Sequence, residues 1–125
     1  MSASLGFKPE VTCAIEVSDF ARAKRWYQEV LGFQQIYSID DIGWCEMTTH
    51  IPGVSVGVSQ VETTHPGPGV VLTWSVTDIE VTRRALEAQD VRFDGPTRVI
   101  EGLVKLASFY DPDGNVFMLA ESLAG

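Results

Sequence analysis

The sequence is poor in the residue types that most often bind metals or form covalent intermediates. Its 125 residues include two histidines and two cysteines. Cys13 and Cys45 lie in apolar segments, and two cysteines without a CxxC pair give no disulfide framework. We therefore expect reduced core thiols in a cytoplasmic protein. We find no Ser/His/Asp or Cys/His arrangement of the kind that supports nucleophilic catalysis.

Basic residues are also scarce, with nine Lys and Arg against seventeen Asp and Glu, and the net charge is −8. An acidic chain without a basic stripe repels phosphate backbones, so nucleic-acid binding is not expected. No apolar run approaches the ~20 residues that cross a bilayer, and residues 1–8 lack the pattern of a signal peptide. The acidity either serves solubility or attracts a cationic ligand.

The sequence does contain an internal repeat. Residues 16–19 (EVSD) align with residues 75–78 (SVTD), about half the chain later. Each tetrapeptide follows an apolar, strand-like run and precedes a helical pattern. Asp19 and Asp78 occupy the N-cap positions of these helices, and Gly32 is placed to end the first one in a left-handed conformation.

Periodicity assigns a buried face and a solvent-exposed face to both predicted helices. We expect the buried stripes to consist of Phe20, Ala23, Tyr27, Val30 and Leu31 in the first helix and of Ile79, Thr82, Ala85 and Leu86 in the second. The solvent-exposed faces would carry Arg22, Lys24, Arg25, Arg83, Arg84 and Glu87.

Three short apolar runs follow each helix, separated by turn residues. They span residues 33–39, 43–48 and 54–58 in the first half, and 91–93, 103–110 and 116–120 in the second. Asp111-Pro112-Asp113-Gly114 predicts a tight hairpin before the last run. The sequence therefore predicts a single α+β domain, residues 1–125, built from two β-α-β-β-β repeats at about 8–62 and 70–122. A Pro- and Gly-rich linker at about 63–69 joins them.

Three segments resemble the vicinal-oxygen-chelate superfamily of glyoxalases, bleomycin-resistance proteins and extradiol dioxygenases. They are residues 14–33, which end in WYQEVLGF, residues 72–78 (LTWSVTD) and residues 109–115 (FYDPDGN). Their order and spacing cover nearly the whole chain. The resemblance implies a curled mixed sheet around a cleft, with the helices on the outer face, and a homodimer.

The resemblance also implies where a divalent metal would be held by His and Glu side chains. The corresponding positions are Thr12, Val71 and Met118, with a fourth within residues 54–58, which contain no acid or His. These residue types are poor donors for such ions. We therefore expect no metal ligands and no cofactor; the alternative is a divalent metal held by other residues.

The sequence supports neither a metal site built on its histidines nor an acid–base pair of Glu46 and His50. His50 and His65 are expected in exposed loops. Glu46 and His50 would share one face of a strand but lie about 13 Å apart along it, too far to bind one ion or to act as an acid–base pair.

Strand alternation assigns further residues to the cleft once Thr12 is placed there. Cys13, Ile15 and Val17 would then face the helix. The sequence does not fix the phase of residues 44–48, so we choose the polar face. The predicted ligand-binding residues are Thr12, Ala14, Glu16, Trp44, Glu46, Val71, Thr73, Ser75, Ser108, Tyr110 and Met118. Glu16 is also the candidate catalytic residue, because a desolvated carboxylate can act as a base or bind a cation.

These residues leave different classes of function open. One is a metal-free binding protein of the bleomycin-resistance type, which holds a small organic ligand, cationic or aromatic, in its cleft and confers antibiotic resistance. Another is an enzyme, a lyase, isomerase or dioxygenase, with atypical metal ligands or with Glu16 or Glu46 as general base. A regulatory or structural dimer with a closed cleft is the third.

Overall fold

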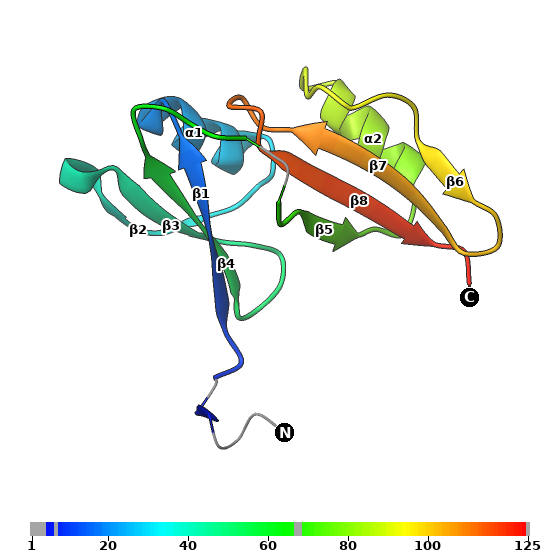
Figure 1. Ribbon diagram of the computed structural model, residues 1–125, viewed down its shortest axis with the longest axis horizontal. Helices are drawn as coiled ribbons and strands as arrows, with labels where there is room; N and C mark the ends of the chain where they lie inside the picture. The colour runs from blue at the N-terminus through cyan, green and yellow to red at the C-terminus, as the bar shows by residue number, and fades with distance from the viewer. Residues whose placement is uncertain (1–4, 7, 67–68, 125) are drawn as a thin grey trace. The chain divides into compact units, whose positions relative to one another are not determined.

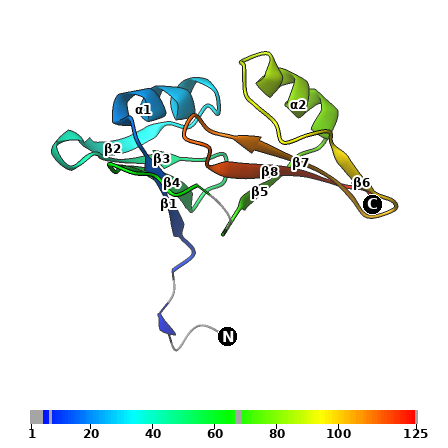
Figure 2. The same ribbon diagram turned by 45° about the horizontal axis from the view of Figure 1, so that its top comes forward.

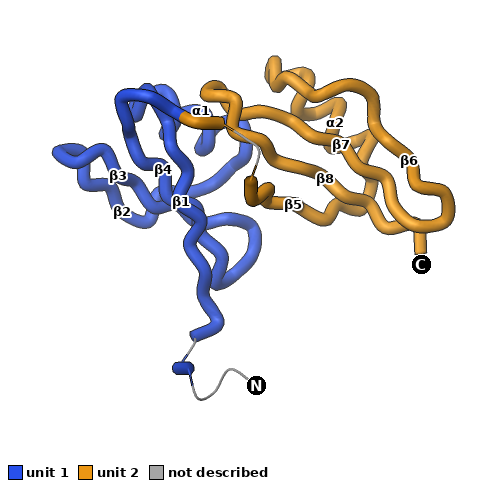
Figure 3. Tube along the Cα trace, in the orientation of Figure 1, with its two compact units in different colours: residues 1–64 blue, residues 65–125 orange. Residues whose placement is uncertain are grey.

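The computed structural model describes residues 5–6, 8–66 and 69–124. The chain divides into two compact units, Met1–Thr64 (unit 1) and His65–Gly125 (unit 2), and the boundary falls inside the predicted linker (Figure 3). In each unit a helix follows the first of four strands (Figure 1). The predicted α+β fold with two β-α-β-β-β repeats is confirmed.

Unit 1 contains one mixed sheet and one helix. Its elements are β1 (Val11–Val17), α1 (Phe20–Glu29), β2 (Gln35–Ile39), the 3₁₀ turn η2 (Asp40–Ile42), β3 (Trp44–Thr48) and β4 (Val54–Gln60). The strand order is β1-β4-β3-β2. Strand β4 runs parallel to β1 and antiparallel to β3, and α1 lies over one face of the sheet (Figure 2).

Helix α1 begins after Asp19, where the sequence predicts, but it ends at Glu29, before Val30 and Leu31 of the predicted stripe. The Asp19 carboxylate accepts a hydrogen bond from the Arg22 amide at 3.0 Å, which satisfies one of the unpaired amides of the first turn. Gly32 has φ of +75° and reverses the chain after the helix. Ala23 and Tyr27 are buried against the sheet, as the periodicity predicts.

Alternation divides the unit 1 sheet into a buried and an open face. The side chains buried under α1 are Ile15 and Val17 from β1, Cys45 and Met47 from β3, and Val56 and Val58 from β4. Their strand neighbours Thr12, Ala14 and Glu16 are exposed. We call this second side, the one away from α1, the open face of unit 1.

Unit 2 repeats the arrangement. Its elements are β5 (Leu72–Ser75), α2 (Ile79–Glu87), β6 (Arg98–Ile100), β7 (Val104–Tyr110) and β8 (Val116–Ser122), in the sheet order β5-β8-β7-β6. Asp78 caps α2, and its carboxylate accepts from the amides of Glu80 at 3.1 Å and Val81 at 3.3 Å. Neither α1 nor α2, the helices of the described part of the chain, has the length and apolar character to span a membrane.

Phe109 is at the centre of the unit 2 core. Its ring stacks on Phe117, with centroids 5.5 Å apart, and lies 5.6 Å from Phe93. Trp74 and Leu119 are buried on the same side of the sheet. The aromatic contacts therefore join β7, β8 and the segment after α2 into one core.

The predicted hairpin at residues 111–114 is confirmed. The buried Asp111 carboxylate accepts hydrogen bonds from the amides of Asp113 and Asn115 and from the Asn115 side chain, at 2.8–2.9 Å. Gly114 has φ of +86°, which an L side chain rarely adopts. The turn thus satisfies its own backbone groups before β8 begins.

The second strand of unit 2 differs from the prediction. Residues 91–93 form only an isolated bridge between Phe93 and Phe109, and the edge strand is Arg98–Ile100, which pairs with β7. All three residues of β6 are exposed. A short edge strand with no buried face has no hydrophobic alternation, so its sequence gives no strand signal.

The assignment of helix faces in α2 is wrong at two positions. Ala85 is exposed rather than buried. Arg83 does not extend into solvent. Its guanidinium lies 4.4 Å from the Phe93 ring centroid and donates hydrogen bonds to the Gly95 carbonyl at 2.8 Å and to the Thr97 hydroxyl at 3.1 Å. Arg83 thereby joins α2 to the loop before β6, a long-range role that helical periodicity cannot reveal.

Replacing Phe109 with alanine should strongly destabilise the protein. The side chain is 1% exposed and contacts two other aromatic rings, so its removal leaves a cavity that costs about 3–5 kcal/mol. Urea denaturation measures the loss. Val70→Ala, at a residue 92% exposed, is the control and should change stability by less than about 0.5 kcal/mol. A loss below about 1 kcal/mol for Phe109→Ala would contradict this description of the core.

Thiol chemistry tests the two faces of the unit 1 sheet. Burial raises the pKa of both Cys13 and Cys45, which lowers the fraction of reactive thiolate near pH 8. Both native thiols should therefore react slowly with a disulfide reagent until the protein unfolds. Ala14→Cys places a thiol on the exposed neighbouring position of β1 and should add one fast-reacting group. Equal rates for all three thiols would refute the assignment of faces.

Candidate functional site

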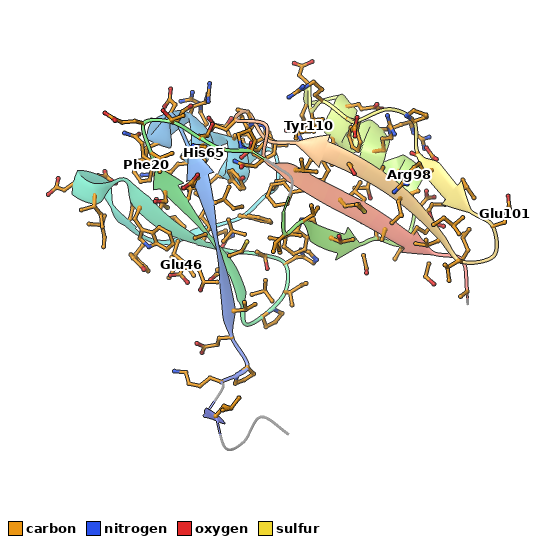
Figure 4. All side chains as sticks on the ribbon, viewed as in Figure 1. Phe20, Glu46, His65, Arg98, Glu101 and Tyr110 are labelled. Carbon is orange, nitrogen blue, oxygen red and sulfur yellow. The ribbon has the colours of Figure 1, made fainter. Side chains whose placement is uncertain are left out.

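The pairing of three strands brings polar residues into rows on the open face of unit 1. At one end Thr12, Ser55 and Thr48 lie side by side on β1, β4 and β3. The next row is Ala14, Gly57 and Glu46, and the third is Glu16, Ser59 and Trp44. Figure 4 shows Glu46 on the side of β3 opposite α1. Residues far apart in the sequence therefore form one continuous surface.

Glu46 is held by two hydroxyl groups from neighbouring strands. Ser55 Oγ donates to Glu46 Oε2 at 2.7 Å, and Thr12 Oγ1 donates to the same oxygen at 3.3 Å. The two hydroxyl oxygens are 2.9 Å apart. We call Thr12, Glu46 and Ser55 the Glu46 cluster. Both hydrogen bonds reach Oε2, so Oε1 can accept a donor from a bound molecule.

A pocket of about 340 Å³ lies beside the Glu46 cluster. Such a volume falls in the range of small-molecule sites, which are mostly apolar with a few convergent polar groups. The remaining lining residues are Glu10, Val11, Ile36, Thr48, Thr49, His50, Ile51, Pro52, Gly53 and Val54. We call this cavity the Glu46 pocket; it lies entirely within unit 1.

The indole of Trp44 lies across β4 at Gly57. A Cβ atom added to Gly57 would be 2.0 Å from Trp44 Cη2, so the ring packs directly on the glycine backbone. The indole Nε1–H donates to Tyr37 Oη at 3.0 Å. A fixed aromatic ring therefore lies two residues along β3 from Glu46.

The structure brings the predicted site residues together within each unit. In unit 1 Thr12, Ala14, Glu16, Trp44 and Glu46 share the open face, and the face chosen for β3 is the one that the strand pairing gives. Thr12 and Glu46 line the pocket, whereas Glu16 does not. Glu16 is exposed rather than desolvated, and its catalytic role stays a prediction.

The predicted residues of unit 2 also lie on one side of their sheet. Thr73, Met118 and Ser108 form a row across β5, β8 and β7. Ser75 occupies the same face of β5 two residues on, and Tyr110 that of β7, where the Arg92 guanidinium lies 4.4 Å from its ring centroid. Val71 is half-buried just before β5.

Sequence reasoning missed several residues of the unit 1 site. Ser55 and Gly57 lie in the strand that we searched only for acids and histidines, and Tyr37 lies on the edge strand β2. The parallel alignment of residues 11–17 with residues 54–60 would have placed Ser55 beside Thr12. Nothing in the sequence indicates that Trp44 covers Gly57.

The premise that Glu46 and His50 lie in one strand is wrong. Strand β3 ends at Thr48 and the chain then turns, so both residues line the same pocket. His50 is exposed, as expected for a loop histidine. The estimate of about 13 Å assumes a straight strand.

The positions that the resemblance gives to metal ligands do not fit a divalent ion. Thr12, Val71 and Met118 are three of them. In unit 2 Met118 pairs with Thr73. The residue of unit 1 that corresponds to Thr73 is Ala14, which pairs with Gly57. Gly57 is therefore the fourth position. Among residues 5–6, 8–66 and 69–124 no three His, Cys, Asp or Glu side chains form a group that could hold a metal. This donor chemistry does not suit a family-type metal centre.

Solved structures share this fold over nearly the whole chain. An antibiotic binding protein, TnmS3 from Streptomyces sp. CB03234, is 26% identical with a TM-score of 0.76, over 94% of this chain and 98% of that one. A glyoxalase/bleomycin resistance protein/dioxygenase superfamily member from Sphaerobacter thermophilus DSM 20745 is 22% identical with a TM-score of 0.79, over 93% and 98%.

A third similar structure is the E126Q mutant of the fosfomycin resistance protein FosX from Listeria monocytogenes, complexed with Mn(II) and 1S,2S-dihydroxypropylphosphonic acid. It is 17% identical with a TM-score of 0.77, over 90% of each chain. A comparison with curated protein sequences gave no match. The family model described as Glyoxalase/Bleomycin resistance protein/Dioxygenase superfamily matches residues 11–119. The chain therefore belongs to the glyoxalase/bleomycin resistance protein/dioxygenase superfamily.

Proposed function

We propose that this protein binds a small organic molecule on the open face of unit 1, with a cationic or hydrogen-bond-donating group of the ligand at Glu46. The observation that carries the proposal is the Glu46 cluster at the wall of the 340 Å³ pocket. A carboxylate fixed by two hydroxyl groups is a preorganised acceptor. Binding therefore requires little reorganisation of the protein.

The remaining lining of the pocket suits an organic ligand. Ile36, Ile51, Pro52 and Val54 provide apolar surface around the polar cluster. Apolar walls lower the local dielectric constant, which strengthens the attraction between a carboxylate and a bound cation. The net charge of −8 adds a long-range attraction for positively charged molecules.

The relatives support small-molecule binding in general terms. TnmS3 is an antibiotic-binding protein, and FosX is a fosfomycin resistance protein. For this chain, a role in antibiotic resistance is part of the proposal. The homodimer and the cytoplasmic location stay predictions.

The donor chemistry, rather than the fold, supports the proposal that binding needs no metal. The side chains at the four family positions are a threonine, a valine, a methionine and a glycine, which do not replace imidazole or carboxylate ligands. Glu46 instead presents an unshared negative charge to the pocket. A cation carried by the ligand can therefore occupy a role that a metal ion has elsewhere.

A second candidate function is metal-free acid–base catalysis. Glu46 and His50 line one pocket, and a carboxylate with an imidazole is a common pair for proton transfer. Once a converted substrate is found, Glu46→Gln separates the two functions. A binding protein loses affinity, whereas an enzyme loses kcat on saturating substrate.

Glu46→Gln should weaken the binding of organic cations. A screen of aromatic and aliphatic ammonium compounds by isothermal titration calorimetry identifies the probe. Loss of a charge-assisted hydrogen bond should then lower its affinity at least about tenfold. Glu101→Gln, the same change of charge at an exposed turn of unit 2, is the control and should leave affinity unchanged. Equal affinity in both variants would exclude Glu46 as the acceptor.

Removal of divalent metals should not change binding. Protein treated with a chelator should hold the same probe with the same affinity, because no ligand contact passes through a metal. The melting temperature in Ni²⁺, Zn²⁺, Mn²⁺, Fe²⁺ or Co²⁺ should stay within about 1 °C, since an ion that bound tightly would raise it by mass action. A stoichiometric metal with a clear rise would reject metal-free binding.

A further inference from the structure

We propose that the Trp44 indole is a stacking platform for a planar aromatic part of the ligand, and that Gly57 and Tyr37 are the residues that position it. This inference rests on the proposed function and names the ligand class: a planar aromatic compound with an ammonium or amidinium group.

Gly57 is required for space rather than for backbone conformation. It lies in the middle of β4, and its φ is not in the left-handed region that favours glycine. A Cβ atom there would lie 2.0 Å from Cη2, 2.4 Å from Cζ2 and 2.7 Å from Cζ3 of Trp44. Any other residue would push the indole off the sheet. The glycine thus allows one face of the ring to lie directly on the backbone.

Tyr37 fixes the remaining freedom of the indole. Its hydroxyl oxygen on β2 accepts from Trp44 Nε1 at 3.0 Å. The six-membered ring is therefore held over β4 while the pyrrole nitrogen is held toward β2. A tryptophan secured in this way loses little conformational entropy when a ligand binds.

The other side of the indole can receive a ligand. Trp44 is only half-buried, although Gly57 beneath it is buried. Two small residues, Ala14 and Ser59, lie next to Gly57 and Trp44 on the open face. An aromatic group stacked on tryptophan gains energy beyond its buried area, and a nearby cation adds to that gain.

The distance between the platform and Glu46 sets the size of the ligand. Trp44 and Glu46 are two residues apart on one face of β3, about 7 Å along the strand. Glu46 also lines the pocket. A ligand whose ring stacks on Trp44 can therefore reach Glu46 with a cationic group one or two bonds from the ring, and any further substituent enters the pocket.

Two probes of equal charge test the platform: 2-naphthylmethylammonium and its saturated counterpart, decahydronaphthalen-2-ylmethylammonium. Calorimetry should show that the native protein binds the aromatic probe about five- to tenfold more tightly. Trp44→Leu should abolish this preference and leave the saturated probe almost unaffected. Gly57→Ala should also abolish it, and Tyr37→Phe should reduce it. Ser59→Ala, on the same face of β4, is the control and should retain it.

A second measurement follows the ring itself. Near-ultraviolet circular dichroism of native protein minus that of Trp44→Leu gives the signal of the held indole. That signal should shrink in Gly57→Ala and Tyr37→Phe while the far-ultraviolet spectrum is unchanged. If both variants keep the full signal, Gly57 and Tyr37 do not position the ring and that part is overturned.

The outcomes separate this inference from the proposed function. Equal binding of both probes, with both weakened by Glu46→Gln, overturns the platform and supports the Glu46 site. A preference for the aromatic probe that survives Trp44→Leu also overturns it. A Trp44-dependent preference, with the affinity of both probes unchanged in Glu46→Gln, supports the platform and refutes Glu46 as the acceptor. Failure of both probes to bind the native protein overturns the platform, whereas the proposed function is overturned if no compound of the ammonium screen binds.

Discussion

The structure depends on one constraint: each four-stranded sheet buries a single face under a single helix. Because neighbouring side chains on a strand point to opposite sides, the residues that fill the core determine which residues are left facing outward. Cys45 and Met47 are buried under α1, so Trp44 and Glu46 must lie on the open face. The core of unit 1 and its site are therefore two consequences of one strand register.

The parallel pairing of the first and last strands of unit 1 turns that open face into a site. Strand β4 lies between β1 and β3, which brings Ser55 between Thr12 and the carboxylate of Glu46. Two hydroxyl groups from different strands can then donate to one oxygen. The pairing of β3 with β4 alone would supply only the Ser55 hydroxyl, and the pairing of β4 with β1 adds that of Thr12.

Sequence reasoning recovers the features that have a local cause. The N-caps Asp19 and Asp78, the left-handed Gly32 and the hairpin after Asp111 each follow from a residue type and its immediate neighbours. Alternation also recovers the open face of β1. Sequence reasoning could not recover the long-range contacts. These are the hydrogen bond from Arg83 to Gly95, the packing of Trp44 on Gly57, and the turn after Thr48 that brings His50 to the Glu46 pocket. These contacts depend on how separate segments pack, and no local pattern encodes them.

One of the positions that lacks a metal donor helps to hold the charged group of the candidate site. The resemblance places a metal ligand at Thr12, but here the Thr12 hydroxyl donates a hydrogen bond to Glu46. A metal-binding site would use its carboxylates to neutralise the ion, so that the organic ligand meets a net positive centre. In unit 1 the carboxylate is oriented by neutral hydroxyl groups, and its charge is left for the ligand. Under the proposed function the complementary ligand carries the positive charge itself, which would account for the Glu46 carboxylate and a fixed aromatic ring on one sheet face.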